Sequence, residues 1–143
     1  MFNLLVRDVM EREKALTLPP ETTVSKAAEM MARKNIGAVM VVEKERLSGI
    51  FTERDALFRV IAPGLDARTT RLAEVMTPEP RTVEPNKSYG YALVMMQENG
   101  FRHTPVIENG KPIGIVTARN AMDPELEEFL TEANRREYIR AEK

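Results

Sequence analysis

The sequence contains no cysteine among its 143 residues. Disulfide bonds, thiolate metal ligands and cysteine nucleophiles are therefore excluded, and the composition fits a reducing compartment. The single histidine, His103, excludes a metal site built from several histidines. Neither sign of charge dominates, because 21 basic residues stand against 22 acidic ones and the net charge is -1. The chain thus has no general attraction for nucleic acid or an anionic membrane, and any anion it binds needs a local site.

Long apolar runs are also missing. The longest, Ile36 to Val42, is far too short to span a bilayer, and the N-terminal stretch MFNLLVRDVMEREK has no apolar core of the kind a signal peptide needs. We therefore expect a cytoplasmic protein that contacts neither membrane nor nucleic acid. What the chain does contain is ordinary globular composition, with 43% apolar and 30% charged residues, enough for one compact unit or two closely packed halves.

The chain repeats itself. Residues 17–55 align with residues 82–120 without a gap, at a constant shift of 65 positions. The matched pairs include Pro20 and Pro85, Ala27 and Ala92, Met30 and Met95, Met31 and Met96, Val41 and Val106, Gly49 and Gly114, Ile50 and Ile115, and Thr52 and Thr117. The dipeptides Val9-Met10 and Val75-Met76 also align, one residue out of register. So many ungapped matches indicate one structural unit present twice.

Each copy is predicted to fold as β-α-β-β-α. A short extended segment precedes a helix, which Thr22 or Thr23 caps in the first copy and Ser88 caps in the second. Two short apolar runs then predict buried strands. Between them, Asn109-Gly110 predicts a tight hairpin in the second copy, whereas the glycine-free EKERL predicts a looser turn in the first. The final helices are expected at residues 53–61 and 118–122.

The sequence therefore predicts an α+β fold of two tandem repeats packed sheet to sheet. A unit of about 60 residues buries too little apolar surface alone, and clefts between two such halves commonly hold ligands. We place the first repeat with its N-terminal segment at residues 1–66, and the linker with the second repeat at residues 67–123. Residues 124–143 are predicted to form a C-terminal helix that docks near a dimer interface, because Asp123 is a good cap and Pro124 suits the first helical position.

Two heptapeptides carry the candidate chemistry, GIFTERD at residues 49–55 and GIVTARN at residues 114–120. Thr52 follows a strand and precedes a helix, so Thr-x-x-Asp is first a capping box. The same helix start also suits a phosphate, and the Asp55 carboxylate can accept hydrogen bonds from the two neighbouring hydroxyls of a ribose. Both interpretations stay open. The second copy carries Asn120, whose amide lacks the charge that strengthens such bonds.

The doubled pattern, with these heptapeptides and FRHTPVIENGKPIGIVT, resembles a pair of CBS domains, also called a Bateman module, from about Val6 to Met122. The resemblance implies a regulatory protein rather than an enzyme, with no required cofactor. It implies AMP, ADP, ATP or S-adenosylmethionine as ligand in the clefts between repeats. It also implies a homodimer, and an unidentified effector protein as the recipient of the signal.

Carried over position by position, the resemblance implies a ribose-binding carboxylate at Asp55, a phosphate-binding hydroxyl at Thr52 and basic phosphate contacts at Arg102 and His103. The base contacts it implies are Thr17, Ile36, Gly37, Ala38, Thr82, Thr104 and Pro105, and the predicted nucleotide-binding set also holds Arg54, Thr117, Arg119 and Asn120. Because Asn120 departs from the pattern, the site at Asp55 is the better candidate. The alternative is a structural dimerisation or scaffold module with vestigial clefts.

Overall fold

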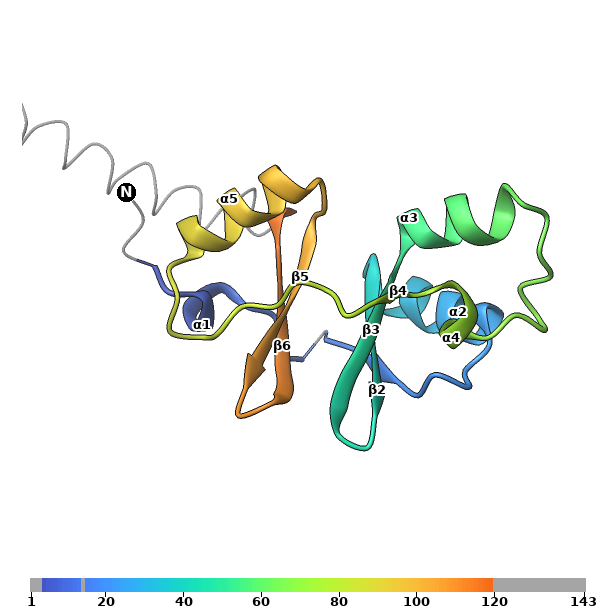
Figure 1. The fold of residues 1–143 in the computed structure, drawn as a ribbon, viewed down its shortest axis with the longest axis horizontal. Coiled ribbons are helices and arrows are strands. Elements are labelled where there is room, and N and C mark those ends of the chain that lie inside the picture. Colours follow the sequence, from blue (N-terminus) through green and yellow to red (C-terminus); the bar gives the residue numbers. More distant parts are fainter. Residues whose placement is uncertain (1–3, 14, 120–143) are drawn as a thin grey trace, which may run out of the picture.

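The computed structural model describes residues 4–13 and 15–119, which are coloured in Figure 1. Within them, two β-sheets lie side by side in the middle of the molecule and the helices cover their outer sides (Figure 1). This arrangement confirms the predicted α+β class with two repeats packed sheet to sheet. The predicted C-terminal helix and Asn120 lie outside the described residues.

The first sheet has four strands in the order β1-β2-β3-β4. Strand β1 (Thr17–Leu18) pairs in parallel with β2 (Ala38–Glu43), which pairs antiparallel with β3 (Arg46–Thr52). The edge strand β4 (Thr77–Pro78) comes from the linker and pairs antiparallel with β3. The helices of this half are α2 (Val24–Lys34), α3 (Glu53–Asp55), η1 (Ala56–Ile61) and α4 (Leu72–Val75).

The second sheet consists of β5 (His103–Glu108) and β6 (Lys111–Thr117), paired antiparallel. Val83 adds a single parallel bridge to Val106 where the repeat predicted an extended start. The helices of this half are α5 (Tyr89–Asn99) and the short α1 (Val6–Val9). The two sheets meet through a small apolar cluster of Ala38, Ile50 and Ile115.

Matching caps define the ends of α2 and α5. Thr23 Oγ1 accepts from Lys26 N at 3.2 Å, and Ser88 Oγ accepts from Tyr91 N at 3.1 Å. A residue with a left-handed backbone follows each helix, Asn35 after α2 and Gly100 after α5. Thr23 rather than Thr22 is therefore the first cap, and the predicted equivalence of the two helices is confirmed.

The two hairpins have the same kind of turn. Asn109 and Gly110 both have positive φ angles, 53° and 78°, as the predicted tight hairpin requires. Lys44 and Glu45 also have positive φ angles, 50° and 66°, so the looser turn predicted for EKERL is wrong. The matching registers of the two strand pairs leave two residues for each connection, and strand twist then favours a turn with positive φ in either repeat.

The helix predicted at residues 53–61 has the expected bounds but two kinds of turn. Its first turn, α3, is α-helical, and η1 is wound as a wider π-helix. The wider turn closes with Ala62 N donating to Leu57 O at 2.9 Å. In the second repeat, Ala118 and Arg119 form the start of a 3₁₀ turn, and the rest of the helix predicted at 118–122 lies outside the described residues.

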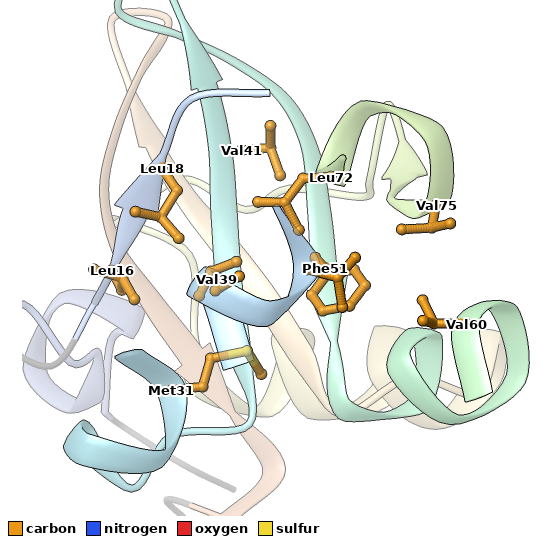
Figure 2. Close-up of a cluster of buried hydrophobic side chains, with 11 residues drawn as sticks. Leu16, Leu18, Met31, Val39, Val41, Phe51, Val60, Leu72 and Val75 are labelled. Atoms are coloured by element: carbon orange, nitrogen blue, oxygen red, sulfur yellow. The ribbon is translucent and has the colours of Figure 1, made fainter. Parts of the chain in front are cut away.

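Short segments are exchanged between the halves. Val6 and Met10, from and just after α1, belong to the apolar core of the second repeat. Leu72 and Val75 of α4 belong to the core of the first repeat, where they pack near Phe51 (Figure 2). The N-terminal segment thus packs on the second repeat, beyond the first repeat in the chain, and the linker packs back on the first repeat.

Candidate functional site

Thr52 and Asp55 form the capping box that their spacing predicts. Thr52 is the last residue of β3, and its Oγ1 accepts from Asp55 N at 3.2 Å. Asp55 Oδ2 in turn accepts from Thr52 N at 3.0 Å. The capping interpretation is therefore confirmed, and the box holds the Asp55 carboxylate in a defined orientation at the start of the helix.

The Asp55 carboxylate has further partners beyond its own helix. Thr52 Oγ1 lies 3.2 Å from Oδ2, Thr77 Oγ1 donates to Oδ1 at 3.1 Å, and Arg59 Nε lies 3.5 Å from Oδ1. The residue is only 7% exposed. A buried polar group is stable in the protein interior when it has hydrogen-bond partners of this kind. Both oxygens of Asp55 are thus occupied by groups of the protein.

A pocket of about 820 Å³ opens beside this carboxylate, between the two repeats. The first repeat contributes the segment from Thr52 to Arg59, the linker contributes Thr77 and residues 79–81, and the second repeat contributes residues 100–103. The volume lies within the range usual for small-molecule sites, about 300–1,000 Å³. The residues of the predicted set that line this pocket are Thr52, Arg54, Asp55, Arg102 and His103.

The other predicted site residues do not line this pocket. They are Thr17, Ile36, Gly37, Ala38, Thr82, Thr104, Pro105, Thr117 and Arg119. Gly37 lies at its margin, since a methyl group at its Cα would come 3.1 Å from Glu53 Oε1 and 3.3 Å from His103 Nε2. Thr104 faces away from solvent with no exposed surface. Asn120, and with it the second predicted site, lies outside the described residues.

The pocket lining carries one more arginine than carboxylate. Four arginines, at positions 54, 59, 81 and 102, stand against three carboxylates, at positions 53, 55 and 79. Arg54 lies over the ring of Phe58, 4.8 Å from its centroid, so its guanidinium is partly positioned by the aromatic face. Such a surface suits an anion, because guanidinium groups bind phosphate oxygens through paired hydrogen bonds.

His103 lies at the start of β5, half-buried on the second repeat's side of the pocket. Burial lowers the pKa of His103 below its ordinary value, and nearby Arg102 lowers it further. The carboxylates of Glu53 and Glu11 act against this and favour the charged ring. Burial has the larger effect, so the pKa of His103 remains lowered and the neutral imidazole is favoured at pH 7.

Sequence reasoning missed Arg59, Thr77 and Arg81. Thr77 had a detectable signal, because it directly follows the dipeptide Val75-Met76 that repeats Val9-Met10. The strand pairing extends this equivalence, since Thr77 pairs with Ile50 and Glu11 pairs with the matching Ile115. The repeat gave no sign of a role for Arg59, because the equivalent residue in the second repeat, at a shift of 65, is Pro124.

Within residues 4–13 and 15–119, no group of three or more His, Asp or Glu side chains is arranged to hold a metal ion. In the same part of the chain, every helix is too short or too polar to cross a bilayer.

The fold belongs to a known family. The family model for the CBS domain matches residues 6–62 and again residues 72–124. The CBS domain-containing protein YhcV of Bacillus subtilis is 36% identical over 111 residues, which cover 78% of each chain. The meiotically up-regulated gene 70 protein of Schizosaccharomyces pombe is 37% identical over 103 residues, and the chain spans 14% of its length. The chain belongs to the CBS-domain family and carries two such domains in tandem.

Solved structures share the fold. A conserved protein from Pyrococcus horikoshii superimposes with a TM-score of 0.80 at 28% identity, over 87% of this chain and 94% of the other. A CBS domain protein from Pyrobaculum aerophilum, complexed with AMP, gives 0.78 at 22% identity over 90% and 99%. The CBS domain pair of protein MJ0100, in complex with 5′-methylthioadenosine and S-adenosylmethionine, gives 0.74 at 22% over 82% and 92%. The last two likenesses concern the fold alone.

Proposed function

We propose that the protein is a regulatory module that binds an adenine nucleotide in the pocket beside Asp55. The observation that carries the proposal is the composition of that pocket. A buried carboxylate that suits ribose hydroxyls lies in the same cavity as four basic side chains that suit phosphate, Arg54, Arg81, Arg102 and His103. An adenosine phosphate presents both groups on one molecule. Two proteins of the same fold carry adenosine-containing ligands, which supports the choice of ligand class.

The charge of the lining favours AMP, ADP or ATP over S-adenosylmethionine. Arg54, Arg81 and Arg102 would attract phosphate oxygens, whereas a sulfonium cation in the same space would meet like charge. Arg102 and His103 are proposed as phosphate contacts, with Thr52 as an additional hydroxyl donor. The base is proposed to lie near the predicted set around Gly37, which borders the pocket beside His103.

One observation favours the second candidate, a structural dimerisation or scaffold module. Both oxygens of Asp55 already accept hydrogen bonds from Thr52 and Thr77. A carboxylate satisfied by its own protein can serve purely to join the helix start to β4. In that case the pocket would have no ligand, and the arginines would be a solvated surface.

Calorimetric titration with AMP, ADP, ATP, NAD and S-adenosylmethionine distinguishes the two candidates. The regulatory proposal expects the phosphate-bearing nucleotides to bind, and Asp55→Asn to weaken them about tenfold or more, because bonds to a charged acceptor are the stronger ones. Asn120→Ala, at the equivalent position of the second repeat, should weaken nucleotide binding less than Asp55→Asn does. Absence of binding to all five ligands at millimolar concentration would leave the scaffold role.

We also propose a homodimer formed through the helical surface, as the route from the pocket to an effector protein. Large apolar side chains are exposed on η1, namely Leu57, Phe58 and Ile61, with Leu65 just beyond and Tyr91 and Val94 on α5. In Figure 1, α5 and the helix formed by α3 and η1 lie on the same side of the sheets. Several large exposed apolar side chains on one side of a protein are typical of a protein interface. Leu57 and Phe58 also line the pocket, so ligand and partner would share one helix.

A further inference from the structure

Hydrogen bonds and an ion pair around Asp55 connect the start of the helix formed by α3 and η1 to β4 and the residue before it. Thr77 of β4 donates to Oδ1 at 3.1 Å, and Arg59 Nε lies 3.5 Å from the same oxygen. Arg59 Nη1 also donates to the carbonyl of Met76, the residue before β4, at 3.1 Å. The Asp55 carboxylate and the Arg59 guanidinium thus hold the first turns of the helix against the linker strand.

The two oxygens of Asp55 have about four acceptor sites between them. Oδ2 serves the backbone N–H and the hydroxyl of Thr52, and Oδ1 serves Thr77 and the Arg59 guanidinium. A ribose that donates two hydroxyls to this carboxylate must therefore replace groups of the protein. Binding at Asp55 is an exchange of partners.

We propose that Arg59 and Thr77 form a latch on Asp55 that competes with the ribose hydroxyls and opens when a nucleotide binds. The proposal rests on the nucleotide-binding function proposed above. It assigns to Arg59 and Thr77 a role in setting the affinity for ribose, distinct from the phosphate-binding role of the other pocket arginines.

The Oδ1 partners are the ones that can leave. Thr52 N–H is held by the capping box, and its release would uncap the helix. The Arg59 side chain is 49% exposed and keeps a second acceptor at Met76 O, so it can leave Oδ1 without losing all of its bonds. Thr77 Oγ1 needs only rotation about one bond to turn from Oδ1 towards solvent or ligand.

Opening the latch would remove the bond between Asp55 and Thr77 and leave η1 joined to the linker through Arg59 and the Met76 carbonyl. This less firmly held helix carries Leu57, Phe58 and Ile61, the exposed apolar residues of the proposed dimer surface. The effect of ligand binding would thus be transmitted to the dimer surface through Arg59, which contacts both Asp55 and the Met76 carbonyl.

The test compares AMP with 2′,3′-dideoxy-AMP, which has the same base and phosphate but lacks both ribose hydroxyls. Affinities are measured by calorimetry on the full chain and on Arg59→Met and Thr77→Val, two variants of similar shape that lack the donors. The latch expects each variant to raise the ratio of AMP affinity to dideoxy-AMP affinity by about two- to fivefold, the size of an exposed ion pair. Phosphate effects cancel in this ratio. Arg68→Met, which removes an ion pair with Asp66 outside the pocket, is the control and should leave the ratio unchanged.

The outcomes separate the two proposals. If wild type binds AMP and both variants show an unchanged or lower ratio, the latch is wrong while the nucleotide site stands. Binding of AMP by the variants but not by wild type supports a strong latch. If neither wild type nor the variants bind either nucleotide, the proposed function fails and the latch fails with it.

Discussion

Asp55 shows how one side chain serves two purposes through the same geometry. Its bonds to Thr52 start the helix, and those bonds also fix the carboxylate at the wall of the pocket. The capping role accounts for Oδ2 and leaves Oδ1 as the atom where protein donors and a ligand would compete. The local motif therefore does not choose between a structural and a binding role, because both use the same orientation.

His103 gives a pH dependence that a single substitution can isolate. The pKa of His103 is lowered in the folded protein by burial, so between this value and its ordinary value of about 6.5 the unfolded chain binds more protons. Stability should therefore be fully present above pH 6.5 and fall as the pH decreases through that value. Melting temperatures of wild type and His103→Gln at pH 7.5 and 5.5 measure the effect.

Between pH 7.5 and 5.5, the melting temperature of the wild type should fall further than that of His103→Gln. The chain has no other histidine, and the terminal amine titrates in both proteins, so the difference belongs to this side chain. Equal losses in the two proteins would show that desolvation of His103 is balanced by Glu53 and Glu11.

Among the elements, the two hairpins achieve one turn geometry with different residues. Asn109 and Gly110 adopt positive φ with little strain, whereas Lys44 and Glu45 are side chains that rarely do so. The first hairpin must therefore be held by the pairing of β2 with β3. The ion pair between Lys111 and Glu45, at 3.2 Å, is exposed at both ends and adds little.

Exchanging the turn residues tests this difference. Lys44→Asn with Glu45→Gly should raise the free energy of unfolding by about 1 kcal/mol, because relief of left-handed strain outweighs the added chain freedom of glycine. The reciprocal change, Asn109→Lys with Gly110→Glu, should lower it by a similar amount. Urea denaturation measures both, and equal stability of all three proteins would mean that the turn residues carry no strain.

The elements also mark the limit of local prediction. The starts of α2 and α5 and the extent of the 53–61 helix followed from caps and apolar spacing, because these signals lie within a few residues of one another. The π-turn of η1 did not follow, because nothing in ALFRVI distinguishes it from an ordinary helix. Its wider turn depends on how the helix packs against the rest of the repeat.

For the whole molecule, segment exchange makes the two halves interdependent. The linker lies directly on Gly49 of β3, and the N-terminal segment lies directly on Gly114 of β6. A side chain at Gly49 would meet Met76, and one at Gly114 would meet the carbonyl of Glu11. The family boundaries at residues 6–62 and 72–124 describe the sequence repeat, whereas each apolar core includes residues from outside its own β-α-β-β-α unit.

The proposed dimer gives a prediction for the assembled protein. Phe58→Ser with Ile61→Ser should weaken self-association about tenfold or more, because buried aromatic and aliphatic residues dominate interface energies. Light scattering over a range of concentrations measures the mass, and wild type should approach twice the 16.2 kDa chain. Ala32→Ser, on the exposed surface of α2, is the control. A monomeric wild type, or a double variant that dimerises equally well, would contradict the proposed surface.

The sequence alone predicted the repeat, the class of fold and the capping box at Thr52 and Asp55. Each depends on neighbours within one turn or one strand, or on a comparison of the chain with itself. The ties of Asp55 to Thr77, 22 positions away, and the meeting of Arg54 and Arg81 with Arg102 in one pocket were not readable. They depend on the path by which the linker crosses the first sheet and on the packing of one sheet against the other, which bring distant positions together without any local signal.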